Sequence, residues 1–322
     1  MIFSLPTHLT AAPDAIDYSP FEIREQNLFN LIHGQALPTN AALIKNNEHL
    51  WSSSLVISNT LNIDASAIES IYLDYETYRF NFSYQYGLGD HWNLKLDIPL
   101  LHQSGGFLDS PIDSWHEFFG LPRANRPFTE DNQYHINYTG ETQSLVDLNE
   151  TSTTLGDIQI AAARSLINNN NTRMSLWAGL KLATGDKNKL SSSGATDFST
   201  WLALNQRLAD NWIMNLNAGL VVLGKDNYQN MPLSDTAVYG HLMLGWLVMD
   251  KLSLKVQLQG HTSYYDQSQL TLLGDSYFLS FGTSIKINQC QQLDIAFSED
   301  IKVNASPDAS LLINWRSYPS AC

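Results

Sequence analysis

Residues 252–261, Leu-Ser-Leu-Lys-Val-Gln-Leu-Gln-Gly-His, alternate between apolar and polar side chains over their first eight positions. Successive side chains of a β-strand point to opposite faces, so this segment predicts a strand with one apolar and one polar face. The same period of two recurs in 92–98, 174–182, 212–222 and 277–288. Repetition on this scale predicts an all-β chain.

Alternation alone also fits a soluble β-sandwich, so other features must decide between the two folds. The candidate strands run about 10 to 14 residues, close to the length that crosses a bilayer at a tilt. The connections alternate between short turns and longer loops, as in outer-membrane barrels. Aromatic residues gather at strand ends, as an interfacial girdle requires: Trp51, Tyr84, Tyr86, Trp92, Trp212, Trp246 and Trp315. We therefore expect a transmembrane barrel.

The expected fold is a closed antiparallel transmembrane β-barrel of about 12 strands, with a long extracellular loop that contains a short helix. The predicted organisation is an N-terminal periplasmic or plug segment (1–48), the barrel (49–318) and a C-terminal tail (319–322). An even strand number places both termini in the periplasm. The predicted strands are 50–63, 70–86, 91–103, 155–167, 172–184, 196–208, 211–223, 236–249, 252–265, 275–288, 292–303 and 309–318.

Composition narrows the choice of partners. Hydrophobic residues make up 43% of the chain and charged residues only 16%, yet no run approaches the roughly 18 apolar residues of a transmembrane helix. The net charge of −14, without a basic cluster, excludes nucleic acid. Acidic residues gather in candidate loops, where they form either a solvated surface or a divalent-cation site beside lipopolysaccharide. We expect outer-membrane lipids and lipopolysaccharide as partners.

The first 48 residues do not read as strands. Residues 10–12, Thr-Ala-Ala, resemble a leader cleavage site, but the residues before them lack a basic region and a full apolar region. Residues 21–29 fit either a helix or an irregular plug. The N-terminal segment is thus either a periplasmic tail or a segment folded into the lumen, and the sequence leaves both open.

Charged and polar residues on the polar faces of the strands are candidates for an interior salt-bridge network or a pore lining. In 71–86 the apolar positions change from odd to even, which predicts a bulge near 77–79 or an upper half that stands above the bilayer. The predicted lumen-facing residues are Asp74, Glu76, Arg79, Lys95, Asp97, Lys181, Lys255, Gln257, His261, Glu299 and Asp300.

Two cysteines, Cys290 and Cys322, are candidates for a disulfide. The predicted topology places Cys290 in a periplasmic turn and Cys322 after the last strand on the same side. The periplasm is oxidising, so the two thiols can pair there if their separation allows it. The alternative is two free thiols.

The hypothesis of enzyme activity rests on His261 and Ser263. These residues share a face of one strand and resemble the His-x-Ser arrangement of the outer-membrane phospholipase. Alternation turns this face toward the lumen, whereas a phospholipase site must face lipid. We therefore favour a hydrogen-bonded lumen histidine and expect no enzyme activity. The sequence contains no phosphate-binding loop, zinc site or calcium repeat, so we predict no cofactor and no metal.

Several motifs together resemble the proteobacterial domain-of-unknown-function family 3187, whose members are predicted outer-membrane barrels. They are Phe21-x-Ile23-Arg24-x-Gln26-Asn27, Leu73-Asp74-x-Glu76-Thr77-x-Arg79, Gly105-Gly106-Phe107-Leu108-Asp109, Trp115-His116-x-x-Phe119-Gly120-Leu121-Pro122 with Arg126, Lys181-Leu182-x-Thr184-Gly185-Asp186, Ser193-Gly194-x-Thr196-Asp197, His261-x-x-x-Tyr265, Glu299-Asp300 and Pro307-Asp308. The resemblance spans about residues 20–318 and implies the fold and the outer membrane. It implies no substrate.

These observations give three functional hypotheses. The first is a channel or passive transporter for a small solute, narrowed by the 104–154 loop, with Asp109, Trp115, His116 and Arg126 as mouth-loop candidates. The second is a structural or interaction barrel that scaffolds a periplasmic or lipoprotein partner. The third and weakest is a lipid-modifying enzyme.

Overall fold

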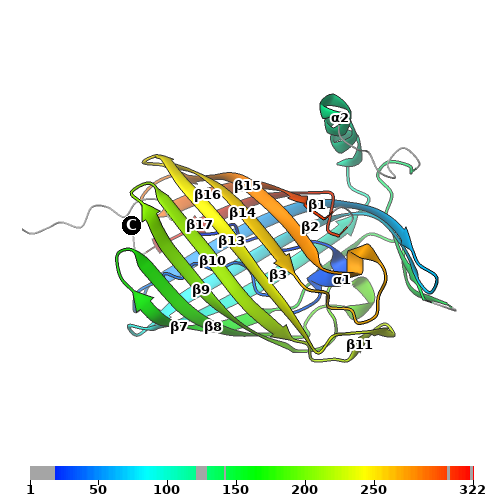
Figure 1. Ribbon diagram of the computed structural model, residues 1–322, viewed down its shortest axis with the longest axis horizontal. Helices are drawn as coiled ribbons and strands as arrows, with labels where there is room; N and C mark the ends of the chain where they lie inside the picture. Colours follow the sequence, from blue (N-terminus) through cyan, green and yellow to red (C-terminus); the bar gives the residue numbers. More distant parts are fainter. Residues whose placement is uncertain (1–18, 121–128, 141–142, 303–304, 320–321) are drawn as a thin grey trace, which may run out of the picture.

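Twelve antiparallel strands close on themselves in the computed structural model of this protein, which describes residues 19–120, 129–140, 143–302, 305–319 and 322. The predicted barrel is thereby confirmed (Figure 1). Its wall consists of β1 (His49–Ala65), β2 (Ser70–Leu88), β3 (Trp92–Ser104), β7 (Gln159–Asn168), β8 (Thr172–Lys181), β9 (Asp197–Ala209), β10 (Trp212–Val222), β13 (Thr236–Met249), β14 (Leu252–His261), β15 (Ser276–Lys286), β16 (Gln291–Asp300) and β17 (Ala309–Ser317).

The first strand closes the ring. β1 pairs with its neighbour β2 on one side and with the last strand, β17, on the other. Val56, for example, stands opposite Arg79 of β2 and Leu312 of β17. A closed ladder leaves no unpaired edge in the wall, which a bilayer demands because it offers no other hydrogen-bond partners.

Side-chain burial is inverted relative to a soluble protein. On β14, the outward-facing Leu254, Val256 and Leu258 are 43–50% exposed, whereas Lys255 and Gln257 between them are at most 1% exposed. The other alternating segments behave in the same way, with apolar residues outside and polar residues inside. The outer surface therefore suits hydrocarbon, and the interior is polar.

The two ends of the barrel differ. At one end, which we call the short-turn end, strands are joined by the turns 89–91, 169–171, 210–211, 250–251 and 287–290. The C-terminus lies at this end (Figure 1). Aromatic rings also gather there, since Trp212 stacks on Trp246 at 5.8 Å between ring centroids and Trp51 packs on Tyr84 at 4.4 Å. The opposite, long-loop end carries the connections 105–158, 182–196, 223–235, 262–275 and 301–308.

At the long-loop end, β1 and β2 continue beyond the other strands as a projecting hairpin. β4 (His135–Thr139) pairs with the start of β2, and β5 (Ser144–Leu148) pairs with β4. The hairpin is regular over residues 49–65 and 70–86, so the predicted bulge near 77–79 is wrong. The change of parity has a different cause: in the upper half the inward residues Ile71, Leu73 and Tyr75 join a buried apolar cluster.

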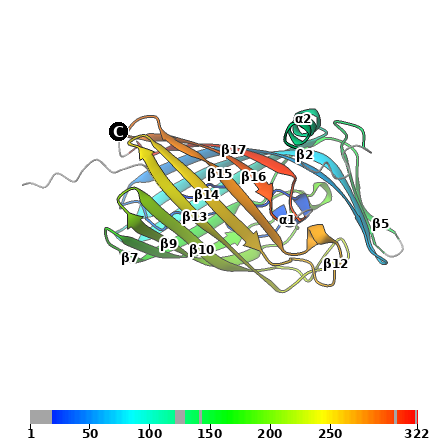
Figure 2. The same ribbon diagram turned by 45° about the horizontal axis from the view of Figure 1, so that its top comes forward.

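The β3–β7 connection contains the predicted helix, α2 (Asp109–Phe119), followed by β4, β5 and β6 (Ser152–Leu155). α2 stands outside the ring of strands, and Phe118 on it is 81% exposed (Figures 1 and 2). The helix therefore does not fold over the lumen, whereas Ile136 and Tyr138 of β4 in the same loop join the apolar cluster that contains α1. Among the described residues, no helix has the length and apolar content that would let it cross a membrane.

The remaining elements are small and lie at the long-loop end. They are α1 (Leu28–Leu31), the β11–β12 ribbon (Asn227–Tyr228 and Met231–Pro232), and the 3-10 turns η2 (Lys187–Lys189) and η3 (Thr271–Leu273). Figure 1 shows α1 within the outline of the barrel, near the long-loop end.

A charge on the outer wall should destabilise the barrel. Leu242 of β13 faces outward, is 39% exposed and pairs with Leu258 and Leu216. We expect Leu242→Arg to lower the free energy of unfolding from lipid vesicles by about 2–4 kcal/mol, the cost of arginine near the bilayer midplane. Leu242→Phe, which keeps the site apolar, is the control in the same urea titration. Equal stabilities of the two variants would contradict a lipid-facing β13.

Candidate functional site

Residues 19–44, which we call the plug, lie inside the barrel. The chain enters near the short-turn end, forms α1 near the long-loop end, and returns to enter β1. Residues 19–39 and 41 are buried, and residues 40 and 42–44 at the return are partly buried. The sequence left open whether this segment is a tail or a plug, and the structure places it in the lumen.

At the short-turn end, the plug is held by charged side chains of the wall. Arg316 of β17 contacts Glu22 of the plug at 3.2 Å and Asp294 of β16 at 3.2 Å, and it donates a 2.8 Å hydrogen bond to the carbonyl of Pro20. Asp294 and Arg316 are at most 1% exposed. Because buried charges are stable only when paired, this network depends on both the wall and the plug.

Two of the three predicted lumen residues on β14, Lys255 and Gln257, complete this anchor. The ammonium of Lys255 donates a 2.6 Å hydrogen bond to the carbonyl of Ser19 and lies 4.0 Å from Asp294. The Gln257 amide both accepts from the backbone N–H of Phe21, at 2.9 Å, and donates to its carbonyl, at 3.1 Å. Gln257 thus supplies the donor and acceptor that a neighbouring strand would otherwise offer.

Lys181 of β8 forms the central contact. Its ammonium lies 2.8 Å from Asp157 and 3.1 Å from Asp197, and it donates a 2.7 Å hydrogen bond to the carbonyl of Ile32 in the plug. The side chain is 2% exposed. Gly34 follows in the plug, where an added Cβ would lie 2.6 Å from the Cβ of Asp197. Only glycine permits this close approach.

The returning limb of the plug is held by neutral amides. The backbone N–H of Thr39 donates to Asn217 at 2.8 Å, and the Thr39 carbonyl accepts from Asn215 at 3.2 Å. Trp201 donates its indole N–H to the Thr39 hydroxyl at 2.8 Å. These three wall residues come from β9 and β10, so one plug residue ties neighbouring strands together.

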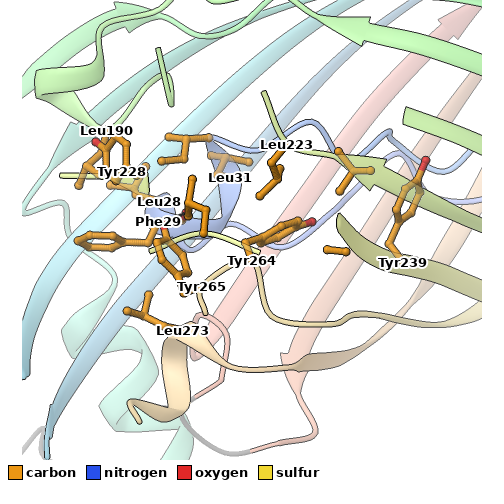
Figure 3. Close-up of a cluster of buried hydrophobic side chains, with 14 of the residues drawn as sticks. Leu28, Phe29, Leu31, Leu190, Leu223, Tyr228, Tyr239, Tyr264, Tyr265 and Leu273 are labelled. Atoms are coloured by element: carbon orange, nitrogen blue, oxygen red, sulfur yellow. Dashed lines mark hydrogen bonds between the residues drawn. The ribbon is translucent and has the colours of Figure 1, made fainter. Parts of the chain in front are cut away.

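Apolar packing holds the tip of the plug. α1 carries Leu28, Phe29 and Leu31 into a cluster with residues of the long loops (Figure 3). The tip is also oriented by hydroxyls, since Tyr265 donates to the Phe29 carbonyl at 2.6 Å and the Leu28 N–H donates to Tyr75 at 3.1 Å. The residues labelled with α1 in this cluster are Leu190, Leu223, Tyr228, Tyr239, Tyr264, Tyr265 and Leu273.

His261 binds the plug and does not pair with Ser263. Its Nε2 contacts the carboxylate of Glu25, and its Nδ1 lies 2.9 Å from the Thr262 carbonyl. The Ser263 hydroxyl instead lies 2.8 Å from the carbonyl oxygen of Tyr265 and 2.6 Å from that of Leu273, and it donates to one of them. The two side chains therefore do not form the nucleophile–base hydrogen bond that serine catalysis requires.

Little room remains around the plug. The space between the plug and β1–β3, lined by Glu22, Asn40, Lys95 and Arg316 among others, is about 30 Å³. Two further spaces beside the plug measure about 10 and 20 Å³. A buried water needs about 10–15 Å³ on this measure, so these spaces hold only a few waters. Among the described residues, these spaces beside the plug therefore admit water but no larger solute.

The predicted lumen residues divide into two groups. Arg79, Lys95, Asp97, Lys181, Lys255, Gln257 and His261 are buried on the inward face, and Lys95 pairs with Asp97 at 3.3 Å. Asp74 and Glu76 instead share the outward face of β2 with Phe80, so their predicted lumen position is wrong. On β16, Asp300 lies on the same inward face as Asp294. Glu299 lies on the outward face with Ile295, so its predicted lumen position is wrong.

The outward face of β2 positions the long loop. Glu76 is buried and accepts hydrogen bonds from the backbone N–H groups of Phe107 and Leu108 and from the Tyr78 hydroxyl. Gly106 has φ +69°, and a Cβ there would overlap the Glu76 carboxylate. Glycine is therefore required where the loop passes this side chain.

The mouth-loop candidates are spread along the same connection. Asp109 begins α2 and accepts from the Asn59 amide and the Asn132 N–H, at 2.9 and 2.7 Å. The backbones of Trp115 and His116 lie in α2, and Arg126 lies outside the described residues. In the described part of the chain, no three acidic, histidine or cysteine residues are grouped to hold a metal ion.

The two cysteines are joined. Cys290, in the turn between β15 and β16, and Cys322, after β17, form a disulfide with a Cα–Cα separation of 5.4 Å. The bond links the C-terminus to the short-turn end, as the predicted topology allowed.

Sequence reasoning missed the acidic and basic partners that come from the plug, one loop and three strands: Glu22, Arg24, Glu25, Asp157, Asp197, Asp294 and Arg316. A usable signal exists for Asp294 and Arg316, which occupy polar positions between apolar neighbours. Asp157 lies outside the strands, so alternation gives no signal for it.

Comparison with known proteins supports the fold. The family model described as "Protein of unknown function (DUF3187)" matches residues 2–317. The COG4313 outer-membrane channel from Pseudomonas putida F1 aligns with a TM-score of 0.58 at 12% identity, over 88% of this chain and 100% of that chain. The NanC porin aligns with a TM-score of 0.46 at 6% identity, over 84% and 98% of the two chains. No curated protein matches the sequence.

Removing the central cation should destabilise the protein. Lys181→Met leaves Asp157 and Asp197 buried without their cation, which costs about 3–5 kcal/mol in urea unfolding from lipid vesicles. A triple variant that also carries Asp157→Asn and Asp197→Asn removes the stranded charges and should recover part of the loss. If Lys181→Met unfolds like the native chain, the ammonium does not hold these carboxylates together.

Proposed function

This chain belongs to the DUF3187 family of proteins of unknown function, and we propose that it is an outer-membrane channel for a small solute, closed at rest by its own plug. The observation that carries the proposal is the passage of residues 19–44 through the lumen. A barrel of about twelve strands can enclose a narrow path when its interior is not filled by side chains. Here a separate segment, rather than the wall itself, fills that path.

The plug is removable in principle because the wall closes without it. Every neighbouring pair of wall strands, including β1 and β17, is hydrogen-bonded directly. The plug adds no strand to this ladder and contacts the wall through side chains such as Gln257, Asn217 and Lys181. Water can replace such polar contacts once the lumen is hydrated, so the plug can leave while the barrel stays folded.

The asymmetry of the two ends supports an orientation. Short turns are periplasmic in outer-membrane barrels and long loops extracellular, so the proposed periplasmic end is the one that carries Ser19 and the Cys290–Cys322 disulfide. Both termini are then periplasmic. The apolar wall contacts outer-membrane lipids, and the long loops meet lipopolysaccharide. In this orientation, a periplasmic or lipoprotein partner reaches the plug at the short-turn end, where the plug enters the barrel.

A second function, a closed barrel that scaffolds a partner, is favoured by the small interior spaces of about 10–30 Å³. In this case the plug is a permanent core, and the projecting hairpin β1–β2 with β4 and β5 is a platform. The two functions differ in one property, because only a channel passes solute.

The plug should act as a gate that can be locked. Thr39 of the plug and Asn217 of β10 have side-chain oxygens 3.0 Å apart, so we place a pair of cysteines at these two positions and verify the disulfide by thiol titration. In a Cys290→Ser/Cys322→Ser parent, we expect Thr39→Cys/Asn217→Cys to abolish liposome swelling and conductance when oxidised and to restore both on reduction. The parent and the single variant Thr39→Cys should conduct with or without reductant.

Two results would count against the proposal. If the parent passes no small sugars, amino acids or ions, the barrel is closed permanently and the scaffold function is favoured. If the oxidised double variant conducts as well as the reduced one, solute passes without displacement of the plug.

A further inference from the structure

In the described part of the chain, two guanidinium groups in the lumen have no carboxylate within ion-pair distance. Arg24 of the plug and Arg79 of β2 are 5% and 4% exposed. Arg24 donates to the backbone carbonyls of His33, at 3.0 Å, Leu31 and Gln35. Arg79 has one hydrogen bond, a 3.3 Å contact to Asn81. Neither group lies within ion-pair distance of an acidic side chain in the described part of the chain, an arrangement that a low-dielectric interior penalises.

Both groups line the same closed space. Its other walls come from plug residues, β3, Lys181 of β8 and the segments around residues 156–159 and 190–191. Nη1 of Arg79 and Nε of Arg24 are buried donors without a protein acceptor. The space measures about 20 Å³, which admits one or two particles of the size of water.

The acidic groups nearby are already committed. Asp157 lines the space but binds Lys181, the Ser192 hydroxyl and the Gly185 N–H. Lys181 is in turn shared with Asp197, so this cluster of one cation and two carboxylates offsets at most one of the two guanidinium charges.

The other carboxylates near the arginines are engaged as well. Asp97 pairs with Lys95, and Glu25, next to Arg24 in the chain, is directed to His261 and Asn30. The space itself is lined by three cations, Arg24, Arg79 and Lys181, and by one carboxylate, Asp157. Two of its guanidinium donors are unsatisfied.

We propose that this space is an anion site, which takes one small anion, either a halide or the carboxylate of a molecule as small as formate. Water can accept the hydrogen bonds but cannot neutralise the charge. Because one arginine comes from the plug and the other from the wall, the anion links the two. The inference does not depend on channel activity and goes beyond it.

Bromide is the direct probe of the site. Crystals of the full chain soaked in bromide should show an anomalous peak within hydrogen-bonding distance of Arg24 and Arg79, and Arg79→Gln crystals should lack it. A second soak contains both bromide and formate. Loss of the bromide peak would show that the site accepts carboxylates, and its retention would show that the site is specific for halides. Absence of the peak in the native chain overturns the proposal.

Thermal unfolding provides a second readout that does not need crystals of the variant. A ligand that binds only the folded state raises the midpoint with its concentration. At constant ionic strength, replacing gluconate by bromide should raise the midpoint of the native chain and of the control Lys251→Gln, in an exposed turn. It should leave Arg79→Gln unshifted. Equal shifts in all three proteins would overturn the site.

Discussion

The structure depends on one constraint: a chain in hydrocarbon must pair all its backbone N–H and C=O groups within the protein. The contact between the first and last wall strands, β1 and β17, satisfies it by removing the last free edges. A closed wall with alternating side chains then has an apolar outer surface and sends every second residue inward. Polar residues such as Lys255 and Gln257 are consequently fixed in a space that the wall alone does not fill.

The plug follows from the inward direction of these polar residues. Inward charges require partners or water, and the structure supplies partners from the N-terminal segment and from neighbouring strands. Arg316 joins Glu22 to Asp294, and Lys181 joins the plug carbonyl of Ile32 to Asp157 and Asp197. The same interactions that stabilise the interior therefore also close it, so any passage of solute requires their exchange for water.

Much of the wall could be predicted from the sequence because strand alternation is a local property. Each predicted strand has a counterpart in the barrel, and the inward face of β14 was assigned correctly, from Lys255 to His261. The assignment of Asp74 and Glu76 failed because the upper part of β2 buries apolar residues inside the mouth, so polarity there no longer marks the lumen. The outward carboxylate of Glu76 is instead covered by the loop at Gly106.

The position of the plug could not be predicted for a different reason. It has no periodicity, and its contacts join residues far apart in the chain, such as Thr39 with Asn217 and Phe21 with Gln257. Such contacts exist only after the barrel has formed, and nothing in residues 19–44 encodes the wall positions they meet. The disulfide differs, because the strand count alone brought Cys290 and Cys322 to the same end.

The accessibility of Ala36 tests most directly whether the plug occupies the lumen in a membrane. Ala36 is 6% exposed, so in a Cys290→Ser/Cys322→Ser background Ala36→Cys should react with a bulky, charged maleimide far more slowly than Lys251→Cys, in an exposed turn. Denaturation should remove the difference. Reaction of the folded, vesicle-embedded Ala36→Cys protein as fast as Lys251→Cys would show that residues 19–44 lie outside the barrel.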